Sequence, residues 1–145
     1  KESAPLTREE VEKILKGDYA FLLYSPHSLC REFYIECTCN MMRPRTIVDY
    51  ERIPWILDAG TVRITFDSDV RAAIGSYDIF DPGLPALSVL EPGKLILEVK
   101  FREMLPQLLR DVLPPPAAEF TAVSKYVLCY EKTRYMNGFE YWYET

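Results

Sequence analysis

Two stretches of the chain alternate strictly between apolar and polar residues. Residues 61–67 read Thr-Val-Arg-Ile-Thr-Phe-Asp, and residues 94–102 repeat the alternation. Successive side chains of an extended strand point to opposite sides, so each stretch has one apolar and one polar face. Residues 46–52 are rich in β-branched and aromatic types, which favour strands. The pattern predicts antiparallel strands, with a hairpin turn at residues 58–60.

Helical spacing occurs in three other stretches. Residues 7–10 form a capping box, and apolar residues follow at helical spacing until Gly17. A second helix is predicted over residues 28–42. A third is predicted to begin at Pro106, with its apolar side chains facing the core, and to end at three consecutive prolines.

The remaining segments give weaker patterns. Residues 70–90 carry several glycines and prolines, which is typical of a long connection with room for one short strand. Another strand is predicted over residues 125–131. The aromatic tail, residues 135–143, fits an edge strand or a docking segment.

Length and composition indicate one globular domain, residues 1–145, and the helix and strand patterns above place it in the α+β class. The chain is 48% hydrophobic and 27% charged, and it has no apolar run long enough for a membrane span. It begins at Lys1 without a methionine or a signal segment, which is compatible with an excised piece of a longer chain.

Cysteine usage and net charge narrow the function classes. Cys30 and Cys129 lack metal-ligand spacing, and Cys37 and Cys39 are two positions apart within a predicted helix. Free thiols in a reducing compartment, the cytoplasm, are therefore expected. The formal net charge of -5 argues against a general nucleic-acid coat. Any anion site must be a local concentration of cations.

The polar faces of the predicted strands mix cations with acids. Arg52, Arg63, Lys100 and Lys125 are the candidate cations for binding phosphate groups. Glu98 would repel the same anion unless a divalent cation bridged them, so it is a candidate ligand of Mg²⁺ or Mn²⁺. If the sheet curls toward a barrel with helices on its apolar side, these charged faces line the interior.

A simpler interpretation stays open beside this one. Charged residues on one side of an antiparallel strand usually face water and form weak surface pairs. Lys125 then becomes an ordinary lysine at the start of a strand, and the isolated His27 a capping or packing residue. The sequence has neither an activated serine or cysteine nucleophile nor a glycine-rich phosphate loop.

Residues 43–52, 61–67, 97–101 and 124–126 together resemble the VTC domain, the polyphosphate polymerase module of the triphosphate tunnel metalloenzyme superfamily. The likeness runs from Leu6 to about Tyr130, and bacterial proteins of this kind look most similar. The resemblance implies an antiparallel β-tunnel, lined by basic residues and glutamates. The tunnel would hold a nucleoside triphosphate, a growing polyphosphate chain and a divalent metal.

Carried over by motif, the resemblance implies roles for individual residues. Arg52, Arg63 and Lys125 would bind phosphate and act in catalysis, and Glu98 would hold Mn²⁺ or Mg²⁺. Lys100 looks like a tunnel-lining neighbour that contacts the substrate.

The chain departs from the family pattern in one respect. The family's N-terminal half carries a Glu-x-Glu-x-Lys element, and nothing in this chain matches it. We therefore expect the C-terminal half of such a domain: an antiparallel sheet forming about half of the tunnel barrel, with three or so packing helices. A second copy or an N-terminal half would complete the tunnel.

Three functions follow from this interpretation. The first is a polyphosphate polymerase that transfers a terminal phosphoryl group. The second is a module that binds or senses polyphosphate without turnover. The third is a structural or inactive fragment whose charged faces contact only water. The sequence leaves open the choice between polymerisation and triphosphate hydrolysis, and it does not name the acceptor.

Overall fold

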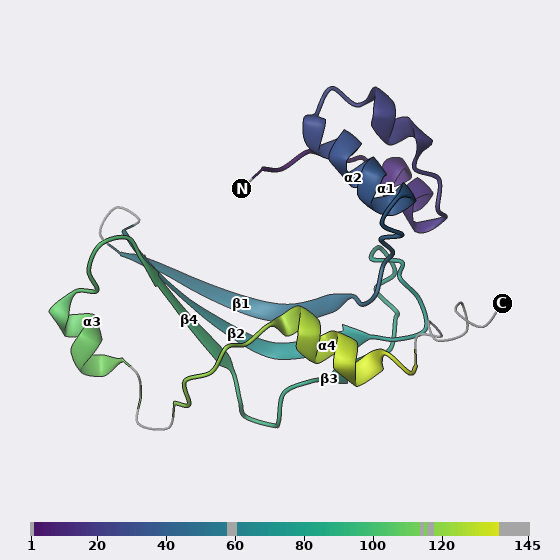
Figure 1. Ribbon diagram of the computed structural model, residues 1–145. Coiled ribbons are helices and arrows are strands. Elements are labelled where there is room, and N and C mark those ends of the chain that lie inside the picture. Colours follow the sequence, from purple (N-terminus) through teal and green to yellow (C-terminus); the bar gives the residue numbers. More distant parts are fainter. Residues whose placement is uncertain (1, 58–60, 114, 116–117, 137–145) are drawn as a thin grey trace.

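The computed structural model describes residues 2–57, 61–113, 115 and 118–136. A four-stranded antiparallel sheet and several helices make up this part of the chain, which confirms the mixed α and β class. The elements in chain order are α1 (Arg8–Leu15), the 3-10 helix η1 (Ala20–Tyr24), α2 (Ser28–Thr38), β1 (Val48–Leu57), β2 (Val62–Ala73), β3 (Ala86–Ser88), β4 (Ile96–Phe101), α3 (Gln107–Val112) and α4 (Lys125–Thr133). Helix α4 lies along the sheet, and α3 lies near the end remote from α1 and α2 (Figure 1).

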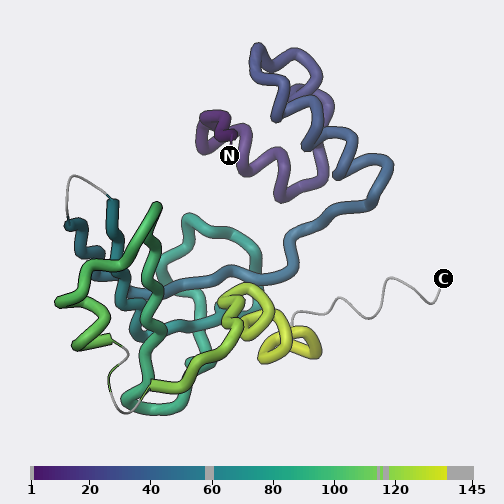
Figure 2. The backbone as a smooth tube through the Cα atoms, turned by 60° about the vertical axis from the view of Figure 1, so that its left-hand side comes forward, coloured from purple at the N-terminus to yellow at the C-terminus, as the bar shows by residue number. Residues whose placement is uncertain are grey.

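The N-terminal helices pack on one another and form a separate cluster (Figure 2). Helix α1 begins at the predicted capping box: the Thr7 hydroxyl accepts from the Glu10 amide at 3.3 Å, and the Glu10 carboxylate accepts from the Thr7 amide at 2.7 Å. The chain leaves this helix at Gly17, whose φ of +83° suits glycine. The buried members of the cluster are Tyr19, Leu22, Cys30 and Cys37.

Strand β2 is the centre of the sheet. It pairs antiparallel with β1 on one side, and with β3 and β4 on the other. The predicted hairpin is therefore confirmed, although its turn at residues 58–60 lies outside the described residues. Among the described strands β1 has β2 as its sole neighbour, which explains how it accommodates Pro54, a residue without an amide donor.

A β-bulge in β2 changes which side chains share a face. The register with β1 shifts between Asp49 and Glu51, and Asp69 on the opposite strand has φ +49°. The extra residue puts Asp67 and Val70, three positions apart, on the same side of the sheet. This side is charged before the bulge and apolar after it, where Val70 packs against Cys129 of α4.

The opposite face of the sheet is apolar along β1, β2 and β4. Ile64 of the central strand is buried between its cross-strand neighbours Trp55 and Val99. On the flanking strands Ile53, Trp55 and Phe101 are 50–60% exposed. The barrel hypothesis placed the packing helices on this apolar side, whereas α4 packs on the charged side.

Three further expectations need correction. The predicted strand at residues 125–131 is helix α4, whose Ser124 hydroxyl accepts from the Val127 amide at 3.3 Å. In α3, Leu108 and Val112 are exposed, so they do not face the core. The predicted connection begins later than expected, because β2 continues to Ala73. Of the predicted aromatic tail, residues 137–143 lie outside the described residues.

The cysteines and the helices bear on two further expectations. All four cysteines are free, and both Cys30 and Cys129 are buried as predicted. Within the described ranges, every helix is too short or too polar to cross a membrane.

Candidate functional site

One face of the sheet collects the charged residues predicted from the sequence. Cross-strand pairing sets Arg52 of β1 opposite Asp67 of β2, and Arg63 of β2 opposite Lys100 of β4. Because no bulge interrupts β2 between these two positions, all four side chains point to the same side. Glu98, two residues before Lys100, shares this side. We call this surface the charged face.

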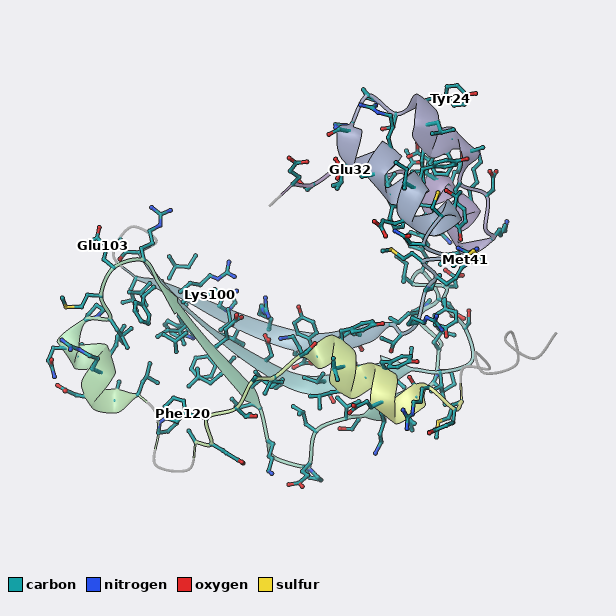
Figure 3. The ribbon with its side chains drawn as sticks, viewed as in Figure 1. Tyr24, Glu32, Met41, Lys100, Glu103 and Phe120 are labelled. Carbon is teal, nitrogen blue, oxygen red and sulfur yellow. The ribbon has the colours of Figure 1, made fainter. Side chains whose placement is uncertain are left out.

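The sheet and α4 place these residues relative to the rest of the fold. Lys100 lies in the part of the sheet toward Glu103, remote from the N-terminal helices in which Tyr24 and Glu32 are labelled (Figure 3). At the other end of the charged face, the first residue of α4, Lys125, reaches over the sheet. The cations therefore come from three strands and one helix.

Asp67 is the centre of the most closely connected group on the charged face. Its side chain is fully buried, and its Oδ1 and Oδ2 accept from Arg52 Nε and Nη2 at 2.6 and 2.7 Å. Lys125 Nζ donates to the same Oδ2 at 2.7 Å. A single carboxylate thus joins β1, β2 and α4. We call these three residues the Asp67 clamp.

The clamp changes the acidity of its members. The hydrogen bonds from Arg52, and after them the contact with Lys125, lower the pKa of Asp67 to about 2 against the opposing effect of burial. The same hydrogen bonds raise the pKa of Arg52. Asp67 and Arg52 are therefore both ionised at neutral pH. Tyr50 lies beneath the clamp, with its ring centroid 5.1 Å from the Arg52 guanidinium carbon and 5.2 Å from Lys125 Nζ.

Glu98 and Lys100 form a second ion pair on the charged face. Lys100 Nζ lies 2.7 Å from Glu98 Oε1, and both side chains are more than a third exposed. The hydrogen bond from Lys100 lowers the pKa of Glu98, and the charges of Lys125 and Arg52 lower it further. The clamp therefore acts on Glu98 through space, which links the two groups electrostatically.

Arg63 differs from the other cations of the face. It is exposed, and within the described part of the chain its guanidinium has neither a hydrogen bond nor an ion pair. An arginine presents a planar fork of donors that matches the oxygens of a phosphate group. Among the four cations of the charged face, Arg63 is the one without a carboxylate partner in the described residues.

The oxygen donors of the face suit a hard cation only in part. Thr65 lies opposite Glu98, and its buried hydroxyl has no hydrogen-bond partner. Asp67 is already bound by two cations and is fully buried. In the described residues no group of three or more His, Cys, Asp or Glu side chains is arranged to hold a metal ion.

The structure thus brings together the residues that the sequence singled out. Arg52, Arg63, Glu98 and Lys100 share one side of the sheet, and Lys125 joins them from α4. Their roles in binding and catalysis stay predictions. Sequence reasoning missed Asp67 as a site residue. Its alternation with Arg63 placed it on the polar face, but the register against Arg52 was needed to identify its partners.

Comparison with protein-family models gives one match, the VTC domain, over residues 1–134. Neither the search of curated proteins nor the search of solved structures gave a match. The family match spans more than half of the 145 residues and covers every residue of the charged face. The family resemblance noted in the sequence is therefore confirmed, and the chain belongs to the VTC domain family.

Proposed function

We propose that the charged face binds a nucleoside triphosphate or polyphosphate and that the domain transfers the terminal phosphoryl group in a polyphosphate polymerase reaction. Membership of the VTC domain family suggests a polyphosphate-related function. The observation that carries the proposal is the excess of positive charge on one face. Four cations and two carboxylates leave that face with a charge of +2, although the whole chain carries -5.

The spacing of the cations favours an extended anion over a single phosphate group. Arg63 lies in β2, and Arg52 is paired with Asp67, which is two same-face steps further along that strand. Each step measures roughly 7 Å, so the two ends of the face are about 14 Å apart. An anion bearing several linked phosphates reaches both ends at once, whereas inorganic phosphate reaches one.

In the proposed reaction, a terminal oxygen of the acceptor attacks the terminal phosphorus of the nucleoside triphosphate. A new P–O bond forms while the bond to the bridging oxygen breaks, and the nucleoside diphosphate leaves with the electron pair. Catalysis of this step rests on positioning and charge neutralisation. Arg63 grips the exposed phosphates, and Arg52 and Lys125 of the clamp neutralise charge at the other end.

A divalent cation fits the face as a partner shared with the phosphates. Mg²⁺ and Mn²⁺ are commonly held by one or two carboxylates, water and substrate oxygens, so a site of three protein carboxylates is not required. Glu98 would supply the carboxylate, and the unpartnered Thr65 hydroxyl lies opposite it. When bound, the metal would offset negative charge on the phosphates next to Glu98.

We further propose that a bacterial cytoplasmic protein uses this chain as the C-terminal half of a triphosphate tunnel. The described sheet is open, with β1 at one edge and β3 and β4 at the other. Strands from an N-terminal half or from a second copy would close the tunnel over the charged face. Closure would lower the local dielectric and strengthen attraction for the anion.

Calorimetric titration with tripolyphosphate tests the proposal. We expect saturable binding that weakens as salt concentration rises, with a further gain in affinity when Mn²⁺ is present. Inorganic phosphate, tested in parallel, should bind much more weakly. If tripolyphosphate does not bind saturably at low salt, then the charged face contacts only water and the proposal is wrong.

Binding without turnover is the second candidate function. Two observations favour this candidate. Asp67 already forms ion pairs with Arg52 and Lys125 and so neutralises part of their charge, and the sheet is open. Incubation with ATP and Mn²⁺, followed by gel analysis of polymer, separates the two candidates. Polymer that appears with the wild type and disappears with Arg63→Ala supports the enzyme. Tight binding without polymer supports the binding module.

A further inference from the structure

We propose that Asp67 is a positioning residue, which holds Arg52 and Lys125 so that their remaining donors face the bound phosphates. This inference rests on the proposed function of the charged face. It concerns an acid to which the sequence motifs assigned no role. It also predicts that removal of this acid weakens anion binding, whereas simple charge repulsion predicts tighter binding.

The burial of the three clamp residues gives the geometry. Asp67 is 0% exposed, whereas the side chains of Arg52 and Lys125 are 32% and 20% exposed. The carboxylate is therefore shielded from solvent, and the solvent-facing part of the clamp belongs to the two cationic side chains. An incoming anion meets these side chains before it meets the acid.

The hydrogen bonds of the clamp leave donors available. Arg52 uses Nε and one hydrogen of Nη2 for Asp67, and the other hydrogens of its guanidinium, including both on Nη1, are not used by the carboxylate. Lys125 gives one of its three ammonium hydrogens to Asp67. Because the fork of Arg52 is fixed at two points, its free edge has one orientation.

A positioning role and a purely repulsive role of Asp67 predict opposite changes in anion affinity when this acid is removed. If Asp67 only repelled the phosphates, then Asp67→Asn would raise the site charge by one and tighten binding. If Asp67 positions the cations, then the same change releases two flexible side chains, and binding must order them again. The sign of the change in affinity therefore decides between the two roles.

The experiment compares Asp67→Asn with Asp69→Asn by titration with tripolyphosphate at one salt concentration. Asp69 lies on the same strand, is exposed and pairs with Arg71, so its substitution removes an equal charge without touching the clamp. Asparagine also tolerates its positive φ. We expect roughly tenfold weaker binding for Asp67→Asn, and equal or slightly tighter binding for Asp69→Asn.

The outcomes separate this inference from the proposed function. Affinity of Asp67→Asn equal to or above that of the wild type overturns the positioning role and leaves the anion site standing. Wild-type chain that fails to bind tripolyphosphate overturns both. Circular dichroism at the titration temperature verifies that each variant is folded.

A measurement on the wild type covers the case in which Asp67→Asn does not fold. The Nε–H group of Arg52 gives its own signal in a proton–nitrogen NMR spectrum, which Arg52→Lys identifies by its loss. We expect this signal to stay protected from solvent exchange when tripolyphosphate saturates the protein, because Asp67 keeps its hydrogen bond. If saturation abolishes that protection, then the anion has displaced Asp67 and the positioning role is wrong.

Discussion

Asp67 and Arg52 face each other across β1 and β2 and are joined by two parallel hydrogen bonds, of 2.6 and 2.7 Å. Such a bidentate pair holds both side chains in one geometry. Lys125 adds a third hydrogen bond, from a helix that begins 58 residues after Asp67. The same carboxylate therefore organises the cations of the site and ties α4 to the sheet.

The first prediction concerns the stability of the clamp. At neutral pH, Asp67→Asn should lower the free energy of unfolding by roughly 2 to 4 kcal/mol, because it leaves two partly buried cations without their carboxylate. Urea denaturation followed by circular dichroism measures this change. Asp69→Asn is the matched control, and we expect it to cost much less because its ion pair is exposed.

The pH dependence of the same variants follows from the lowered pKa. Folding lowers the pKa of Asp67 from 3.8 to about 2, so the unfolded chain takes up a proton first as pH falls. The stabilisation from the clamp is therefore complete above about pH 5 and is lost between that pH and pH 2. The difference between wild type and Asp67→Asn should shrink over this interval. A difference that stays constant to pH 2 would contradict the role of ionised Asp67.

Strand patterns and motifs were enough to predict the charged face. Alternation assigned Arg63 and Lys100 to polar sides, and the sheet brings those sides together because β2 pairs with β4 as well as β1. The bulge at Asp69 could not be predicted, because the pattern of apolar and polar residues around an aspartate at positive φ is the same as in a regular strand. Burial of Asp67 depends on that bulge, because the apolar patch that follows it supports α4.

The assignment of α4 was wrong for a related reason. Tyr126, Val127 and Tyr130 belong to types that favour strands, so local preference predicted one. Tertiary contacts decide otherwise: the thiol of Cys129 is buried against Val70, and Ser124 caps the helix. Neither the packing partner nor the register of that contact is visible in the local sequence.

Arg63 should matter for anion binding and little for folding. Because it is exposed and without a partner in the described part of the chain, Arg63→Ala should change the free energy of unfolding by less than about 0.5 kcal/mol. Its loss should weaken tripolyphosphate binding roughly tenfold or more and lower the salt dependence. Arg110→Ala removes an exposed arginine of α3, which is not one of the residues of the charged face, and serves as the control. Equal losses for the two variants would refute a specific role for Arg63.

Glu98 should govern the response to metal. Without metal, Glu98→Gln should bind tripolyphosphate more tightly than the wild type, because one repelling charge is gone. Addition of Mn²⁺ should strengthen wild-type binding and leave the variant nearly unchanged, and a chelator should reverse the wild-type gain. Titrations of both proteins with and without Mn²⁺ measure the effect. Glu91→Gln removes an exposed acid from another ion pair and should retain the metal response.

The bulge at Asp69 yields a prediction about backbone geometry. A left-handed conformation is costly for most residues, and β-branched side chains tolerate it least. With φ of +49° at this position, Asp69→Val should lower the free energy of unfolding by roughly 2 kcal/mol. Asp69→Gly removes the same exposed carboxylate but accepts the conformation, so its stability should be close to that of the wild type.

Comparing the valine and glycine variants isolates the bulge from the lost ion pair with Arg71. The bulge keeps Asp67 and Val70 on one side, so a strand that straightens would turn one of them away from α4. Asp69→Val should therefore also weaken tripolyphosphate binding, through loss of the contact between Lys125 and Asp67, whereas Asp69→Gly should bind as the wild type does. Denaturation and titration of both variants measure the two effects. Equal stability and equal affinity for the pair would mean that the positive φ at this residue does not set the geometry of the clamp.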